Sequence, residues 1–318
     1  MFTIDAEIEA ARPAMRAFCA QLAAAGPLLP PFDTLEKVAA TRATGVPQLI
    51  RDAATVLPVE ERVVPGRSGD IPVRIVRPSS PPAAVYVDFH GGGFCIGWAI
   101  QHDVANAKLA RDAGVACVSV DYRLAPEHPF PAGPEDCVDA ARWVIENAQR
   151  EFGCSRIIVG GDSAGGNLAL LTAVALRDEG LAHAVIGMHL VYGVFDLSMT
   201  PSSRVAVDTL VINRDDAKMF NGYYAPGASP EQLRDPRYSP LYSAAAGLAP
   251  ALLLVGDADP LLDDSLFAFA RFQAAGVDAE LLVFPEAPHG FVSFPTAYAE
   301  IAHRRTVAWI GRRIAATG

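Results

Sequence analysis

Residues 161–165, Gly161-Asp162-Ser163-Ala164-Gly165, lie between two runs of different character. The preceding residues 156–160 (Arg-Ile-Ile-Val-Gly) are typical of a buried strand, and residues 167–171 (Asn-Leu-Ala-Leu-Leu) are typical of a helix. The sequence therefore predicts a strand that turns sharply into a helix at Ser163. The flanking glycines fit this prediction, because a side chain in so tight a turn would collide with the neighbouring backbone. A turn of this kind exposes the serine hydroxyl and indicates a nucleophile.

A second motif, His90-Gly91-Gly92-Gly93, ends another strand-like run at residues 84–89. In hydrolases that carry a nucleophilic serine on such a turn, a glycine-rich motif of this type donates backbone N–H groups to the oxygen that becomes negative on the substrate carbonyl. The two motifs occur in the expected order. Their pairing disfavours the alternative, a tight serine turn in a nucleotide-binding or structural fold.

Composition narrows the class of protein. A chain of 318 residues with 51% hydrophobic content can bury a large core, and its length suits one α/β domain with an additional cap. The net charge of −10 and the lack of a basic run argue against nucleic acid and against an electrostatic membrane anchor. No run approaches the roughly 18 apolar residues of a membrane span.

The cysteines favour a reducing compartment. The five residues Cys19, Cys95, Cys117, Cys137 and Cys154 are odd in number and form no Cys-x-x-Cys pair, so neither a disulfide framework nor a metal site is expected. The first nine residues lack the basic and apolar segments of a signal peptide. We therefore expect a soluble, cytoplasmic protein.

The order of predicted elements indicates an α/β fold with a mostly parallel central sheet flanked by helices. Residues 1–56 are alanine-rich and helical in pattern, with expected breaks at Pro13, 26–27 and 30–31 and a capping box at Asp33 and Glu36. A hairpin follows over 62–76. Strands and helices then alternate as in βαβ units: strands at 84–89, 115–120, 156–160, 184–191, 251–256 and 279–284, and helices at 103–113, 135–149, 164–178, 263–275 and 297–314.

The polar segment 195–245 interrupts this alternation. We interpret it as the second part of a cap whose first part is the N-terminal helical arm, residues 1–56. The catalytic core is then expected over 57–194 and 246–318.

A nucleophilic serine needs a base and a group that orients the base. Asp259 and His289 each follow a predicted strand, and the order Ser163, Asp259, His289 matches the Ser…Asp…His order of this type of hydrolase. Asp259 also precedes Pro260 at the start of a predicted helix, so an N-cap is an alternative role. Three further carboxylates, Asp257, Asp263 and Asp264, are alternatives to it, and the histidines other than His90 and His289 show no partner in the sequence pattern.

Together the motifs resemble one family. They are His90-Gly91-Gly92-Gly93, Asp121-Tyr122-Arg123-Leu124-Ala125-Pro126-Glu127-His128, the segment 161–166, Asp259-Pro260-Leu261 and His289-Gly290-Phe291. In this order they are similar to the hormone-sensitive lipase family of serine esterases. The resemblance runs from about residue 60 to the C-terminus and is weakest over 195–235.

The resemblance implies an α/β-hydrolase fold with a helical cap and a catalytic triad. Ser163 would be the nucleophile, His289 the general base and acid, and Asp259 its orienting carboxylate. The backbone N–H groups of Gly92, Gly93 and Ala164 would form the oxyanion hole.

Supporting roles are expected for four further residues. His90 would order the oxyanion loop beside Gly91, while Asp162 and Glu127 would either bond around the serine turn or remain solvated or ion-paired.

The implied activity is that of a carboxylesterase for short- to medium-chain esters, which needs no metal or cofactor. Hydrolysis of amides or lactones on the same triad is an alternative. A catalytically silent ligand-binding homologue is another, but such relatives have lost the histidine that is present here as His289. Relatives often form homodimers through the elements nearest the C-terminus, and the apolar run 281–284 is a candidate edge.

The sequence departs from the family in two places. Gly-Met-x-His is usual before the catalytic histidine, where this chain has Glu286-Ala287-Pro288-His289. Gly193 stands where a proline commonly follows the position of Tyr192. The first departure directs attention to the geometry of the loop that carries His289.

Overall fold

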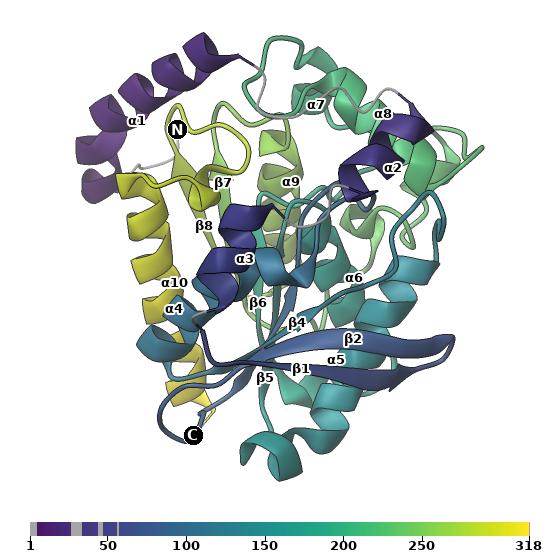
Figure 1. Cartoon of the computed structure of the whole chain (residues 1–318), viewed down its shortest axis with the longest axis vertical. Helices are drawn as coiled ribbons and strands as arrows, with labels where there is room; N and C mark the ends of the chain where they lie inside the picture. Colours follow the sequence, from purple (N-terminus) through teal and green to yellow (C-terminus); the bar gives the residue numbers. More distant parts are fainter. Residues whose placement is uncertain (1–4, 27–33, 44–46, 56, 318) are drawn as a thin grey trace.

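A computed structural model describes residues 5–26, 34–43, 47–55 and 57–317, and within them a single eight-stranded sheet runs through the molecule (Figure 1). Its order is β1-β2-β4-β3-β5-β6-β7-β8. The pairs β1–β2 and β2–β4 are antiparallel and the other pairs are parallel, which confirms the mostly parallel α/β sheet. The strands are β1 (Val59–Gly66), β2 (Gly69–Val76), β3 (Val85–Phe89), β4 (Ala116–Val120), β5 (Ile157–Asp162), β6 (Val185–Val191), β7 (Ala251–Gly256) and β8 (Ala279–Phe284).

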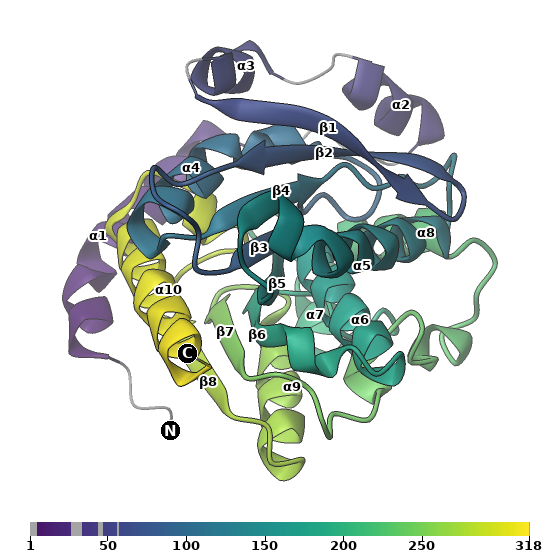
Figure 2. The same ribbon diagram turned by 90° about the horizontal axis from the view of Figure 1, so that it is seen from below.

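Helices cover both faces of the sheet (Figure 2). On one face lie α5 (Ala132–Phe152), α6 (Ala164–Asp178) and α9 (Leu262–Ala274), which share one hydrophobic core with the strands. On the other face lie α4 (Asp103–Ala113), α10 (Ala297–Ala316) and α1 (Ala6–Ala25), which share a second core. The central strands are apolar on both sides, as expected for parallel strands covered by helices.

Strand β3 illustrates how the sequence divides between the two cores. Val85, Val87 and Phe89 pack in the core beneath α5, α6 and α9, whereas Tyr86 packs in the core beneath α4 and α10. This alternation follows from the two-residue period of a strand. It also assigns Asp88, two residues after Tyr86, to the α4 and α10 side.

The remaining elements include the predicted cap segments. Four helices, α2 (Leu35–Ala43), α3 (Gln48–Thr55), α7 (Pro201–Val205) and α8 (Arg214–Tyr224), belong to segments 1–56 and 195–245. In Figure 1 α2, α7 and α8 all lie toward the top of the molecule, and α7 contacts α8. Short 3-10 helices are η1 (Ala99–His102), η2 (Ala182–Ala184), η3 (Gln232–Arg234), η4 (Pro240–Tyr242) and η5 (Phe291–Ser293).

Helix α1 differs from the prediction. A break was expected at Pro13, but this expectation is wrong, because α1 continues through Pro13 from Ala6 to Ala25. An interior proline costs about 3 kcal/mol through the lost hydrogen bond and the clash with the preceding turn. Ile8 and Met15 on either side are each only 1% exposed and pack in the core shared with α10, and this burial offsets the cost. The predicted cap residue Asp33 and the prolines at 27, 30 and 31 lie outside the described residues.

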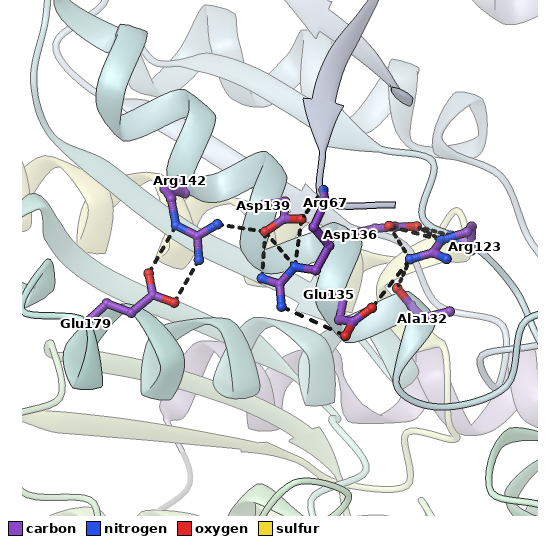
Figure 3. Close-up of polar contacts among 8 residues, drawn as sticks. All are labelled: Arg67, Arg123, Ala132, Glu135, Asp136, Asp139, Arg142 and Glu179. Atoms are coloured by element: carbon purple, nitrogen blue, oxygen red, sulfur yellow. Dashed lines mark hydrogen bonds and ion pairs between the residues drawn. The ribbon is translucent and has the colours of Figure 1, made fainter. Parts of the chain in front are cut away.

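Ion pairs attach the β1–β2 hairpin and the loop after β4 to α5 (Figure 3). Arg67, in the hairpin turn, bonds to Asp139 at 2.6 Å, and Arg123 bonds to Asp136 at 2.8 Å. Both aspartates are buried, so removing Arg123 would leave the Asp136 charge without its partner, whereas Asp139 would keep its pair with Arg142 at 2.7 Å. Figure 3 also draws Ala132, Glu135, Arg142 and Glu179, which extend this network.

In the part of the chain that is described, no helix combines the length and the apolar character needed to cross a bilayer.

Candidate active site

Ser163 occupies the turn between β5 and α6, as the sequence predicts. Its backbone has φ 55° and ψ −119°, a left-handed conformation that a residue other than glycine adopts at a cost of about 1–3 kcal/mol. A Cβ atom at Gly165 would stand 1.9 Å from the carbonyl oxygen of Phe89, so only glycine allows α6 to start this close to β3. The neighbouring strand thus enforces the strained turn.

Three side chains from different elements meet at this turn. Ser163 Oγ lies 2.9 Å from Nε2 of His289, which is on the loop after β8. The other ring nitrogen, Nδ1, lies 2.9 and 3.0 Å from the two carboxylate oxygens of Asp259, after β7. Asp259 is 3% exposed and His289 6%. This is the geometry of a nucleophile, a base and a buried carboxylate that fixes the ring.

The carboxylates that were alternatives to Asp259 have other partners. Asp257 accepts the backbone N–H of Glu286, and Asp263 accepts that of Ser202. Asp264 accepts the backbone N–H groups of Phe195 and Asp196, on the loop after β6. Asp259 also accepts the N–H of Leu261 at 2.8 Å, within the turn that precedes α9, but the N-cap of α9 is Leu261 and not Asp259.

The glycine-rich loop after β3 lies against the same turn. Gly92 has φ 123°, and a Cβ atom there would be 2.1 Å from the carbonyl oxygen of Ile96. The Gly92 carbonyl accepts N–H groups from Cys95 and Ile96, which closes the loop on itself. Gly91, Gly92, Gly93 and Ala164 all line the cavity that also contains Ser163 and His289.

The motif Asp121-Tyr122-Arg123 supports this loop from below. Tyr122 donates its hydroxyl to the carbonyl of His90 at 2.7 Å and stacks on the His90 ring, whose Nδ1 lies 2.8 Å from the Gly91 carbonyl. Asp121 accepts the N–H of Ala99 at 2.8 Å. The motif contributes no group to the cavity, and its contacts show that it fixes the backbone on both sides of the glycines.

Of the two other supporting candidates, only one lies at the turn. Asp162 Oδ1 accepts the N–H of Gly91 at 2.9 Å. Glu127 instead pairs with Arg42 on α2, and its side chain is 53% exposed. Glu127 therefore connects the N-terminal segment to the core and does not contact Ser163.

The cavity over Ser163 has a volume of about 340 Å³ and is mainly apolar. Its walls come from the oxyanion loop (Phe94, Ile96, Trp98), from the core (Val194, Leu261) and from segments 1–56 and 195–245 (Thr41, Val211, Ile212, Phe220). It can therefore enclose an apolar group next to the serine hydroxyl.

Residues 86–293 match the family model described as the alpha/beta hydrolase fold. The chain belongs to the α/β-hydrolase family. Among its relatives, carboxylesterase NlhH of Mycobacterium tuberculosis is 40% identical over 254 residues, covering 75% of this chain and 76% of the relative. Ethyl acetate hydrolase of Pseudomonas putida is 36% identical over 229 residues, covering 70% and 71%. A solved esterase of Pyrobaculum calidifontis superposes with a TM-score of 0.82 at 33% identity, covering 94% of this chain and 98% of that chain. These matches confirm the resemblance to hormone-sensitive-lipase-like esterases.

This α/β-hydrolase has Glu286 where its family usually has glycine, and Glu286 forms ion pairs with α1. Glu286 has φ 59°, in the left-handed region that favours the usual glycine. Its carboxylate bonds to Arg12 Nε at 2.8 Å and to Arg16 Nε at 2.7 Å, both on α1. Hydrogen bonds from Arg16 and Arg12 lower the pKa of Glu286 to about 2. The loop that carries His289 is thus attached to the N-terminal helix.

Two polar residues of this α/β-hydrolase, Asp88 and His102, belong to none of the sequence motifs and were not predicted. His102, at the end of η1, lies between Asp88 on β3 and Asp162 on β5. One signal was available: Asp88 is a carboxylate inside the otherwise apolar run 84–89, and a charge in a buried strand requires a partner. The identity of that partner depends on the path of the loop after β3 and cannot be obtained from spacing.

The buried carboxyl group of Asp264, which contacts the loop after β6, should make the stability of the protein depend on pH. Burial raises its pKa from 3.8 to about 7, although it accepts bonds from Thr200 and two backbone N–H groups. Between about pH 4 and 7 the folded protein therefore binds a proton that the unfolded chain releases, and stability falls as pH rises. We expect Asp264→Asn to gain about 2–3 kcal/mol of unfolding free energy relative to the parent between pH 5 and 8. Denaturant unfolding of both proteins at both pH values measures this, and a pH-independent difference would contradict it.

Proposed function

We propose that this protein hydrolyses short- to medium-chain carboxylic esters and that Ser163 forms the acyl-enzyme intermediate. The reaction class follows from sequence similarity. The protein is a carboxylesterase, since relatives at 36–40% identity over most of the chain are ester hydrolases. The observation that carries the mechanism is the continuous contact from Asp259 through His289 to Ser163.

The first half of the reaction forms the acyl-enzyme. Ser163 Oγ attacks the ester carbonyl carbon while His289 Nε2 takes the hydroxyl proton, and the carbonyl oxygen becomes negative. When this tetrahedral adduct collapses, the bond to the alcohol oxygen breaks and His289 returns the proton to that oxygen. Asp259 holds Nδ1–H throughout, so that Nε2 faces the serine and the imidazolium is stabilised.

The second half repeats these steps with water. A water molecule takes the place of the alcohol, His289 removes its proton, and the oxygen attacks the acyl carbon. Collapse then releases the acid and returns the proton to Ser163. No metal or cofactor enters either half.

The negative oxygen is held by backbone groups. The N–H groups of Gly92, Gly93 and Ala164 form the proposed oxyanion hole, and Ala164 also places it at the N-terminus of α6, where the helix dipole favours negative charge. Loss of one such donor typically lowers kcat about 10²–10³-fold. His90, Gly91 and Asp162 support the donors through the contacts described above.

The cavity suggests the size of the substrate. A volume of about 340 Å³ with apolar walls accommodates a short to medium acyl or alcohol group. Helix α2 and the segment 195–245 act as a cap, because Thr41, Ile212 and Phe220 line the cavity from these parts, whereas α1 of the predicted first cap part packs beside α10. Each buried methylene contributes only about 0.8 kcal/mol, so selectivity is graded with chain length.

Hydrolysis of p-nitrophenyl esters from acetate to laurate tests this proposal. We expect kcat/KM to rise with chain length until the cavity is filled and then to fall, with the maximum at short to medium chains. A p-nitroanilide and a lactone of matched acyl size test the amidase and lactonase alternatives, and turnover of either with a kcat/KM comparable to that of the ester would support them. No turnover of any ester, combined with tight binding of an uncleaved one, would support a silent ligand-binding protein.

Two further properties belong to this proposal. The protein acts in the cytoplasm, as its five unbridged cysteines suggest. It forms a homodimer through β8, which is an edge strand and carries the half-buried residues Leu281, Leu282 and Val283. Light scattering of the purified protein measures the second property.

A further inference from the structure

A chain of polar groups lies behind the oxyanion loop, of which Asp88 is buried and His102 and Asp162 are half-buried. It consists of Asp88, His102, Asp162 and the backbone N–H of Gly91, and we call it the His102 chain. His102 Nδ1 is 2.8 Å from Asp88 Oδ2, and His102 Nε2 is 3.3 Å from Asp162 Oδ1. That same Asp162 oxygen accepts the Gly91 N–H at 2.9 Å. The chain therefore connects the middle of β3 to the first glycine of the oxyanion loop.

The surroundings of His102 favour its protonated form. Both ring nitrogens face carboxylate oxygens, and an imidazole donates from both nitrogens only when it is protonated. Burial alone would lower the pKa of His102, but the charges and hydrogen bonds of Asp88 and Asp162 outweigh burial and hold it well above the ordinary 6.5. Burial likewise opposes the charge of Asp88, and His102 is the main influence that lowers the Asp88 pKa. Each charge thus depends on the other.

Asp88 is itself firmly held. Its Oδ2 accepts hydrogen bonds from Asn106 at 2.9 Å and from Ser119 at 2.8 Å, and the residue is 4% exposed. A carboxylate in a central strand costs several kcal/mol of desolvation, which an apolar side chain at this position would avoid. Fold stability alone does not explain why an aspartate occupies position 88, whereas a requirement for a charged His102 does.

Asp162 transmits this arrangement to the oxyanion loop. It precedes Ser163 directly, and a Cβ atom at Gly91 would be 2.7 Å from its Oδ2, so the loop lies on this carboxylate. A carboxylate free to rotate would leave the Gly91 N–H without its acceptor and would allow Gly92 and Gly93 to shift. Donors in an oxyanion hole act through their fixed position, so a small shift lowers the rate.

We propose that Asp88 and His102 are positioning residues that, through Asp162, hold the Gly91–Gly93 loop in the conformation that stabilises the transition state. The inference rests on the proposed role of this loop as the oxyanion hole. Neither residue lines the cavity over Ser163, so both act on the rate and not on the binding of the ester.

The first test compares His102→Gln with the parent enzyme on p-nitrophenyl butyrate. We expect kcat to fall about 10- to 100-fold, less than the loss of a donor itself, and KM to change less than about threefold. A trifluoromethyl ketone, which forms a charged tetrahedral adduct with the serine, should bind more weakly by about the same factor as kcat/KM. Active sites are counted with diethyl p-nitrophenyl phosphate so that rates refer to folded enzyme.

His303→Gln is the matched control. His303 pairs with Asp112 at 2.8 Å and lines a cavity of about 390 Å³ between α4 and α10, which His102 and Asp162 also border. It has no contact with the His102 chain. Its variant should keep the parent kcat and the parent affinity for the ketone.

Asp88→Asn provides a readout that a merely structural role would not change. Asp88 is the first of the charges that raise the pKa of His102, so without it burial lowers that pKa. The charged form exists below the pKa and disappears as pH rises through it, and kcat of Asp88→Asn should therefore decline at lower pH than kcat of the parent. The other titratable groups around His102 are Asp162, His90, the pairs Lys108–Glu300 and His303–Asp112, and His189, whose pKa burial lowers to about 4.

The outcomes are distinct. Parent-like kcat in His102→Gln, or a lower kcat with unchanged affinity for the ketone, would overturn the inference, and so would an unshifted pH profile in Asp88→Asn. If His102→Gln yields no titratable sites, Asp88→Asn alone decides by the same three measurements. Ser163→Ala, measured in parallel, separates the two proposals, because retained activity there defeats the serine mechanism and not the positioning of the loop.

Discussion

Ser163→Ala is expected to lower kcat for p-nitrophenyl butyrate about 10⁴- to 10⁶-fold. The substitution removes the atom that forms the acyl bond, and in a triad the loss of the nucleophile costs nearly as much as the loss of all three groups. Alanine lacks only the hydroxyl, and it tolerates φ 55° no worse than serine does. The folded structure should therefore be retained, which circular dichroism and thermal unfolding check, while nitrophenolate release measures the rate.

Ser155→Ala is the control for this experiment. Ser155 is exposed and precedes β5 at the end opposite Ser163, so its variant should keep the parent rate. Mass spectrometry after treatment with diethyl p-nitrophenyl phosphate should find the phosphoryl group on Ser163 in the parent and in Ser155→Ala. Turnover in Ser163→Ala within tenfold of the parent, or the label on another residue, would refute the assignment of the nucleophile.

Asp259→Asn should have the second largest effect, a fall in kcat of about 10⁴-fold with a small change in KM. The asparagine amide presents an N–H group toward Nδ1 of His289 and favours the tautomer in which Nε2 carries the proton. Nε2 then cannot accept the proton of Ser163, although the distances of 2.9 and 3.0 Å around His289 need not change. The loss should thus come from the proton position alone, and steady-state kinetics measure it.

Asp263→Asn serves as the matched variant, since Asp263 is close to Asp259 in sequence but contacts Ser202 instead of His289. The Asp263 carboxylate accepts the backbone N–H of Ser202, and the backbone N–H of Asp263 donates to the Ser202 hydroxyl. The variant should retain the parent kcat within a few-fold. If kcat fell less than tenfold in Asp259→Asn but fell strongly in Asp257→Asn or Asp264→Asn, the carboxylate that orients His289 would be Asp257 or Asp264 and not Asp259.

The centre of the sheet was predictable because strands such as β3, β4 and β6 are buried on both faces. Such strands appear as short continuous apolar runs, and the bounds of β3, β4 and β6 lie within one residue of the predicted ranges. The path of α1 through Pro13 was not predictable, because it depends on packing against α10 at the other end of the chain. Local propensity favours a break there, and burial of Ile8 and Met15 overrides it.

The candidate site also contains residues that could be predicted from the sequence and residues that could not. The motifs indicated Ser163, Asp259 and His289, which the structure brings into contact, while their roles remain predictions until the kinetics are measured. Motifs fail for groups whose partners are set by loop geometry. His102 is 14 residues from Asp88, and Arg16 is 270 residues from Glu286, and no local pattern connects either pair.

The ion pairs between Glu286 and α1 connect the first helix to the loop that carries His289. A helix that contributes no residue to the reaction and no wall to the cavity nevertheless holds the backbone three residues before His289, against the preference of Glu286 for a right-handed conformation. The guanidinium groups that hold it are partly solvent-exposed, so dissolved salt competes with them. The first helix therefore constrains the loop that carries His289, although the two lie at opposite ends of the sequence, and a high salt concentration should loosen this constraint.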